Sequence, residues 1–191
     1  MSIAFLYITG IALTVLQAST GSPQALDPTA DRDTYAVYAT LLQLTSRDGQ
    51  ATRPIVLQRE IERPATASSC TAFLAAMTGE WAEVAASFHR DNSRVRLLQP
   101  GVLGEYKLVS RAEILADDAR LAAEQPGHTN SLRPGAIEYV AFSAVGFNAA
   151  KTKALVYVRN RTAQGLFNGM GMWELKAGRW ITGSGSCGGV A

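Results

Sequence analysis

Short apolar runs separated by turn residues dominate the C-terminal part of the chain, from Ile137 to Gly183. The runs mix β-branched and aromatic residues with polar ones, as partly buried strands do. Turn formers divide them at 146–152 and at 176–178, where Lys-Ala-Gly favours a three-residue hairpin loop closed by the glycine. The pattern predicts an antiparallel meander with strands at 137–145, 154–160, 169–175 and 179–181.

The part of the chain before this meander shows helical spacing instead. Apolar residues share one face in residues 31–44, 73–88 and 111–124, so helices are expected there. Gly79 lies inside the second stretch and weakens a helix by about 1 kcal/mol relative to Ala, which favours two helices joined at that residue. Residues 54–61 predict one more strand, at a sheet edge because Pro54 has no amide hydrogen to donate.

These elements predict a single α+β domain over residues 31–191, with helices packed on one face of the C-terminal antiparallel meander. A sheet curved around its helices, similar to the nuclear transport factor 2-like group, is one version of that architecture. Residues 22–30 are rich in Ser, Pro and Thr and predict a mobile segment before the domain. The glycine-rich residues 183–188 predict a flexible tail.

The N-terminal residues indicate export. An apolar run from Ile3 to Leu16 precedes the first charged side chain, Asp27, and small residues that suit cleavage follow it between Ala18 and Ala25. A run of about fourteen residues is shorter than the roughly twenty that span a membrane, and it suits the core of a signal peptide. We therefore expect a signal peptide over residues 1–21, with an uncleaved anchor as the alternative, and a periplasmic or secreted protein.

Composition places the chain among ordinary globular proteins. Charged residues make up 18% of it and hydrophobic residues 47%, which excludes a disordered chain. The net charge of +2 is too small to indicate nucleic-acid binding, which needs a clustered basic face. Residues 183–188 match the GxGxxG dinucleotide fingerprint in letters alone, because no helix is expected after them to hold a phosphate. The sequence therefore predicts no cofactor.

Cys70 and Cys187 are the only cysteines, and in an exported protein two cysteines most simply form one disulfide. A thiol nucleophile activated by His89 or His128 is the alternative, in which the imidazole would remove the thiol proton. The histidines lack HExxH spacing, and no cysteine cluster accompanies them, so the sequence predicts no zinc site.

Aromatic residues of the meander are the candidate binding residues. Such side chains can form a stripe on which sugars or bases stack, or they can fill the core between a sheet and its helices. The candidates are Tyr139, Tyr157, Trp173 and Trp180.

Motifs spread over the chain from Cys70 onward carry a family resemblance. They are Glu80-Trp81, Phe88, Asn92, Tyr106–Ser110, Glu113, Ser143–Asn148, Ala154–Val158 and Leu175–Trp180. With them the chain resembles a group of exported bacterial proteins that has no assigned activity, so the resemblance implies export and a shared fold. Members of that group often carry a Cys-Gly motif between the last strands, where this chain has Leu166–Gly171 without cysteine. A cysteine-based role of that loop is therefore not expected here.

Two functions remain open. The first is an exported, non-catalytic module that binds an unidentified partner or small ligand through its sheet. The second is a small exported hydrolase or thiol enzyme, whose Cys, His and carboxylate side chains would converge in one cleft. Carboxylates at short spacing usually lie on a solvated surface, but they can also serve a hydrolase. The available pairs are Glu60 with Glu62 and Asp117 with Asp118.

Overall fold

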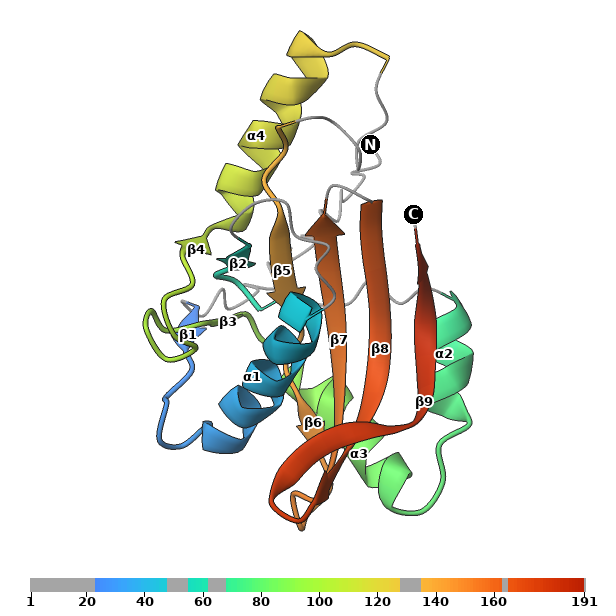
Figure 1. Cartoon of the computed structure of the whole chain (residues 1–191). Coiled ribbons are helices and arrows are strands. Elements are labelled where there is room, and N and C mark those ends of the chain that lie inside the picture. Colours follow the sequence, from blue (N-terminus) through green and yellow to red (C-terminus); the bar gives the residue numbers. More distant parts are fainter. Residues whose placement is uncertain (1–22, 48–54, 62–67, 128–134, 163–164, 191) are drawn as a thin grey trace, which may run out of the picture.

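The computed structural model describes residues 23–47, 55–61, 68–127, 135–162 and 165–190. Its helices are α1 (Arg32–Arg47), α2 (Ser68–Ala75), α3 (Glu80–Asp91) and α4 (Arg111–Glu124). The strands of its main sheet are β2 (Val56–Gln58), β4 (Leu108–Val109), β5 (Tyr139–Phe142), β6 (Gly146–Phe147), β7 (Lys153–Thr162), β8 (Gly165–Lys176) and β9 (Arg179–Val190). The order along this seven-stranded sheet is β4–β2–β5–β7–β8–β9, with β6 paired to β7 (Figure 1).

The C-terminal meander is present and confirms the α+β fold. Strands β5, β7, β8 and β9 pair antiparallel in sequence order. β2 lies between β4 and β5 and runs parallel to both. The edge position predicted for residues 54–61 is therefore wrong, because Leu108 and Val109 of β4 pair with β2 and cover its other side. Pro54 lies outside the described residues.

Both faces of β7 are buried, because its residues alternate between two apolar clusters. Val156 packs with Tyr38 of α1 on one face, whereas Leu155 packs with Phe88 of α3 on the other. In Figure 1, α1 crosses the front of the sheet and α2 and α3 lie behind it. The prediction of helices on one face only is therefore wrong. A strand covered on both sides carries a continuous apolar run, and Ala154–Tyr157 is such a run, buried throughout.

The helices begin and end near the predicted residues. Gly79 separates α2 from α3 and takes a φ of 58°, which glycine adopts without strain. α4 spans the predicted residues, and its first turn carries a capping box. Glu113 N–H donates to Ser110 Oγ at 3.1 Å, and Ser110 N–H donates to Glu113 Oε2 at 2.7 Å. The start of α4 is thus determined by local side chains.

A β-bulge links β5 to β6. Phe142 pairs with Val158 and Gly146 pairs with Leu155, so the three residues Ser143–Val145 stand opposite two residues of β7. The predicted first strand, 137–145, is interrupted there, because the extra residue breaks the ladder. Beyond the bulge, β6 packs against α3.

The segment before α1 packs against the rest of the domain. β1 (Gln24–Ala25) pairs in parallel with β3 (Arg96–Leu97), and Leu26 is fully buried. Arg96 of β3 donates two hydrogen bonds of 3.1 Å to the Asp31 carboxylate, which also attaches the segment before α1 to β3. Residues 24–26 and Asp31 make these contacts. They lie within and just after residues 22–30, the segment that the sequence predicts to be mobile.

The glycine-rich C-terminal residues form part of a strand. β9 continues to Val190 and pairs with β8, so the flexible tail predicted for residues 183–188 is wrong. Backbone hydrogen bonds build such a ladder without help from side chains, which is why composition alone misleads there. The β8–β9 loop is also shorter than predicted: Lys176 pairs with Arg179, and the two residues between them, Ala177 and Gly178, both have positive φ.

Candidate functional site

The aromatic residues predicted to bind a ligand lie in three separate clusters. Trp173 and Trp180 pack in the core that includes α1, Tyr157 packs with α2 and α3, and Tyr139 packs with Ile114 of α4. None of the four predicted residues has more than 8% of its surface exposed. The fold therefore does not bring them together as a stacking platform, and their contacts are those of core residues.

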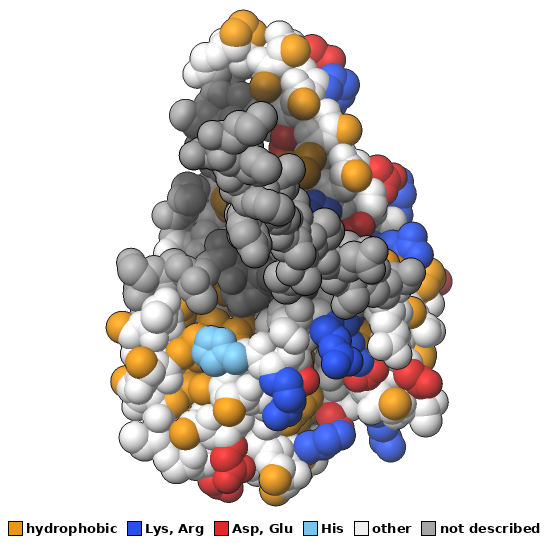
Figure 2. Space-filling view, turned by 180° about the vertical axis from the view of Figure 1, so that it is seen from behind, with side chains coloured by type: hydrophobic (Ala, Val, Ile, Leu, Met, Phe, Trp, Pro, Cys, Tyr) orange, Lys and Arg blue, Asp and Glu red, His pale blue; other side chains and the backbone are white. Residues whose placement is uncertain are grey.

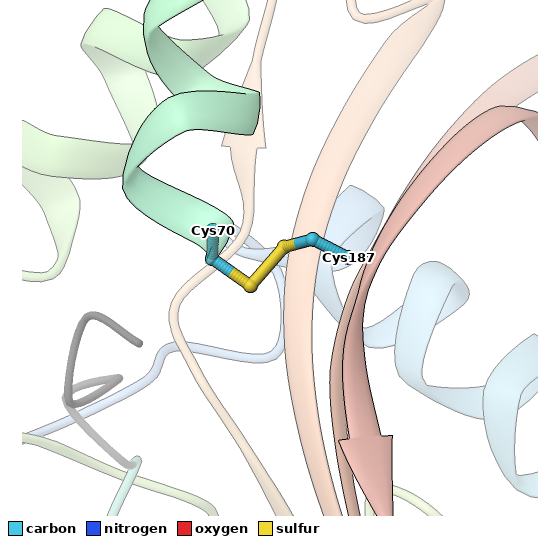
Figure 3. The surroundings of a disulfide bond; sticks show 2 residues. All are labelled: Cys70 and Cys187. Carbon is cyan, nitrogen blue, oxygen red and sulfur yellow. A yellow bond between two sulfur atoms is a disulfide. The ribbon is translucent and has the colours of Figure 1, made fainter. Parts of the chain in front are cut away.

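The two cysteines are brought together, although 117 positions separate them in the chain. Their Sγ atoms lie 2.06 Å apart, so that Cys70 of α2 is joined to Cys187 of β9 (Figure 3). This agrees with the predicted disulfide and leaves neither cysteine as a free thiol. His89 is exposed near the end of α3, and His128 lies outside the described residues. The structure thus provides no Cys–His pair among the residues that it describes.

Two of the candidate carboxylates bind backbone groups around α4. Glu60 Oε2 accepts a hydrogen bond from Arg111 N–H at 2.7 Å, at the start of the helix. Asp117 Oδ2 accepts one from Ile137 N–H at 3.1 Å, just before β5. These carboxylates position the helix beside the sheet. Glu62 lies outside the described residues.

The fourth carboxylate, Asp118, belongs to a partly buried ion pair with Arg161 of β7. Arg161 Nη1 lies 2.5 Å from Asp118 Oδ1, and Arg161 Nε donates to the carbonyl of Ile137 at 2.7 Å. The guanidinium also lies 4.8 Å from the centre of the Tyr139 ring. The Arg161 side chain is 5% exposed and the Asp118 side chain 30% exposed, so the pair is buried on the arginine side and open to water on the carboxylate side. It is a structural contact that connects α4 to the sheet.

In the described part of the chain, no three His, Cys, Asp or Glu side chains are grouped so that they could hold a metal ion. Hydrogen bonds from Lys153 and Lys176 lower the pKa of the exposed carboxyl groups of Glu80 and Glu174, respectively. Of the helices in the described ranges, none is both long and apolar enough to cross a membrane.

An uncharged surface is the feature that distinguishes one side of the molecule. Three segments contain no Asp, Glu, Lys, Arg or His, in a chain with 18% charged residues. They are Ser68–Gly79, which includes α2, Gly165–Trp173 of β8 and Trp180–Val190 of β9. β8 pairs with β9, and the disulfide joins β9 to α2, so the three segments are adjacent. We call this surface the uncharged flank.

The uncharged flank is open to solvent. Phe167 on β8 and Ile181 on β9 are 52% and 40% exposed, although both are large apolar side chains. Thr71, Ala72 and Ala75 of α2 are exposed and small. Figure 2 shows the described part of this side at the lower left of the view, where orange and white atoms predominate and the blue and red ones lie below it or farther to the right. Loss of charged residues is typical of the centre of protein–protein interfaces.

β9 also forms a free edge of the sheet. Within the described residues, no strand pairs with its outer side. The opposite edge strand, β4, has two residues, whereas β9 has twelve. From Trp180 to Val190 the edge contains neither a charge nor a proline, the features that commonly keep an edge strand from pairing with another chain. Its outward N–H and C=O groups can bind an added strand.

The free edge is held in position from behind by α2. Cys187 is bonded to Cys70, and a methyl group added at Gly185 would lie 2.4 Å from Met172 Sδ, so β9 packs closely there. A register shift between Gly171 and Trp173 separates two regular parts of the β8–β9 ladder. The part of β9 from Ser186 to Val190 is a preformed strand. Preformed elements bind with a smaller loss of conformational entropy.

Sequence reasoning missed this site for two reasons. Its signal, three segments without charge, is visible in the sequence, but the segments lie far apart along the chain and only the strand order places them together. The sequence also predicts a flexible tail at residues 183–188, so the edge strand that these residues belong to is not expected from it.

No protein-family model, no curated protein and no solved structure matches the chain. The resemblance to a group of exported bacterial proteins therefore stays a prediction.

Proposed function

We propose that the protein is an exported interaction module that binds an extended segment of a partner protein along the free edge of β9. The observation that carries this proposal is the edge itself, a twelve-residue strand at the end of the sheet that is uncharged from Trp180 to Val190. In strand addition, backbone hydrogen bonds supply affinity, and the side chains beside the edge supply specificity.

Export is supported by two independent features. The apolar run from Ile3 to Leu16 has the length and position of a signal-peptide core. The Cys70–Cys187 pair is of the kind that persists in oxidising compartments such as the periplasm or the extracellular space. We therefore place the function of the processed chain outside the cytosol.

The surroundings of the edge favour an uncharged and partly apolar partner segment. Phe167 and Ile181 expose apolar surface on β8 and β9, and fully burying such a side chain stabilises a complex by roughly 1.5–3 kcal/mol. A charged residue placed against the uncharged flank would lose hydration without gaining a counter-charge. We expect extended segments with β-branched or small uncharged residues.

The alternative function, a small hydrolase or thiol enzyme, has less support. Its hydrolase form would need carboxylates that converge in one cleft, but Glu60 and Asp117 accept hydrogen bonds from backbone N–H groups and Asp118 pairs with Arg161. Its thiol-enzyme form requires a nucleophilic thiol, but Cys70 and Cys187 are bonded to each other. It also requires a histidine within hydrogen-bonding reach of that thiol, and the described histidine, His89, is exposed on α3.

The test is a selection of random displayed peptides on the exported, processed protein, followed by calorimetry with the selected peptides. Ser186 is exposed in the middle of the uncharged edge, and we expect Ser186→Lys to weaken peptide binding about tenfold or more, because lysine on an edge strand opposes strand addition. The control is Ala122→Lys, which adds the same charge at an exposed position of α4 and should bind peptides as the wild type does.

Hydrogen exchange locates the binding site independently. Bound peptide should slow exchange of amide groups in β9 and leave those of α4 unchanged. The proposal is contradicted if the monomeric protein binds no peptide, or if the selected peptides bind Ser186→Lys as well as they bind the wild type.

A further inference from the structure

We infer that the partner at this edge is a second copy of the same chain, with the two β9 strands paired antiparallel about a two-fold axis. The inference rests on the proposed function, because it uses the same edge, and it adds the identity of the partner. The pairing would join the seven-stranded sheets of both copies into one continuous sheet.

The lack of charge is the first argument for a second copy. A two-fold contact brings each residue of a surface close to its own counterpart. Any ionisable group in the middle of that surface would then face an identical charge, and like charges at an interface repel strongly. The segments Ser68–Gly79, Gly165–Trp173 and Trp180–Val190 of the uncharged flank contain no such group, so the flank can contact itself without repulsion. A different protein would commonly gain from complementary charges, which this flank does not offer.

Each copy also offers the strand partner that the other copy lacks. The free edge of β9 presents unpaired N–H and C=O groups, and the second copy presents an identical row. With the axis beside Ser186, residue Ser184 of one copy lies beside Gly188 of the other. These residues are small, so the two backbones can approach to the usual strand spacing of about 4.8 Å.

The helix behind the edge is compatible with this arrangement. In an antiparallel pair, the two copies of α2 lie on the same face of the continuous sheet, one on each side of the axis. The exposed residues of α2 include Thr71, Ala72 and Ala75, which are small and uncharged. They leave room for the second helix and place no charge near it.

The experiment is sedimentation of the exported, processed protein over a wide range of concentrations. We expect a reversible monomer–dimer equilibrium for the wild type. Ser186→Lys and Ser186→Glu should each raise the dimer dissociation constant about tenfold or more, because two identical charges meet at the axis. An equimolar mixture of the two variants should dimerise at least as well as the wild type, since lysine then faces glutamate. Ala122→Lys should have no effect.

Restored dimerisation in the mixture also shows that both variants are folded. The inference is overturned if the wild type stays monomeric at every concentration, if Ser186→Lys leaves the dissociation constant unchanged, or if the mixture is no better than the separate variants. Failure of the inference differs from failure of the proposed function. A monomer that still binds displayed peptides, with Ser186→Lys weakening them, keeps the function and assigns the edge to another protein, whereas loss of both results overturns both.

Discussion

Asn92, just after α3, replaces the missing strand partner of Ala144 in the bulge between β5 and β6. Ala144 N–H donates to Asn92 Oδ1 at 3.0 Å, and Asn92 Nδ2 donates to the Ala144 carbonyl at 3.2 Å. The same amide nitrogen lies 2.8 Å from the carbonyl of Phe88, inside the helix. One side chain thus satisfies the backbone of the bulge and fastens it to α3.

Replacing Asn92 tests this relationship directly. Asn92→Ala leaves the N–H and C=O of buried Ala144 without these partners, which should lower the free energy of unfolding by about 1–3 kcal/mol. Urea unfolding measures the loss. The matched control is Asn168→Ala on β8, because the side chain of Asn168 makes no hydrogen bond within the described residues. Equal losses in both variants would contradict the role given to Asn92.

Gly146 is predicted to tolerate no side chain. A methyl group at this position of β6 would lie 2.5 Å from both Phe88 N and Val84 O, which belong to the backbone of α3. Because neither backbone atom can move without shifting the helix, Gly146→Ala should lower the free energy of unfolding by about 1–3 kcal/mol or more. Thermal unfolding checks this against Gly189→Ala, where no atom lies within 4 Å of the added methyl group. A melting temperature unchanged by Gly146→Ala would show that α3 can move away.

The β8–β9 turn is predicted to accept a stabilising substitution. Ala177 and Gly178 have φ of 49° and 75°, the conformation of a two-residue turn that Asn-Gly prefers. An alanine in the left-handed region costs roughly 1–2 kcal/mol, and asparagine tolerates this region better. Ala177→Asn should therefore raise the free energy of unfolding by about 0.5–1 kcal/mol. Ala150→Asn, in another exposed turn, is the control, and no gain at Ala177 would show that the turn is relaxed already.

The pH dependence of stability should include a contribution from Glu113. Hydrogen bonds from Ser110 N–H and Oγ lower the pKa of this carboxyl from its ordinary value of 4.5. A carboxyl with a lower pKa in the folded state stabilises the fold above its unfolded pKa, and this contribution is lost as the pH falls through the folded pKa.

We therefore expect the stability difference between the wild type and Glu113→Ala to stay constant in neutral solution and to shrink below pH 4.5. Urea unfolding at a series of pH values measures the difference. Glu105→Ala, at an exposed position outside the capping box, should show no such trend. A difference between wild type and Glu113→Ala that grows in acid would have the wrong sign.

Removal of the disulfide should weaken the domain and its edge together. Cys70 and Cys187 close a loop of 117 positions, and a cross-link of that span contributes about 4–5 kcal/mol on the chain-entropy model. The double variant Cys70→Ala/Cys187→Ala should unfold at lower urea concentration, and amide exchange in β9 should become faster than in β7. The wild type with and without a reducing agent is the internal control. Equal stability in both states would show that the bond adds nothing to the fold.

The local elements could be predicted because short-range interactions determine them. Ser110 and Glu113 lie three positions apart and cap α4 whatever the rest of the chain does. Gly79 separates two helices because of its own backbone freedom, and the apolar runs of β7 and β8 form strands by their own composition. The pairing of the two cysteines could be predicted because there are only two and the N-terminal residues predict export.

The helices, most of the strands and the disulfide thus follow from the sequence, because they depend on residues that are near in the chain or few in number. Three other features are visible only in the folded structure: β2 lies inside the sheet, both faces of the sheet are covered, and residues 183–188 form an edge strand. The same holds for the adjacent uncharged surfaces of α2, β8 and β9. These features depend on backbone pairing between distant segments. Because backbone N–H and C=O groups are the same in nearly every residue, no local sequence pattern predicts which strands will pair.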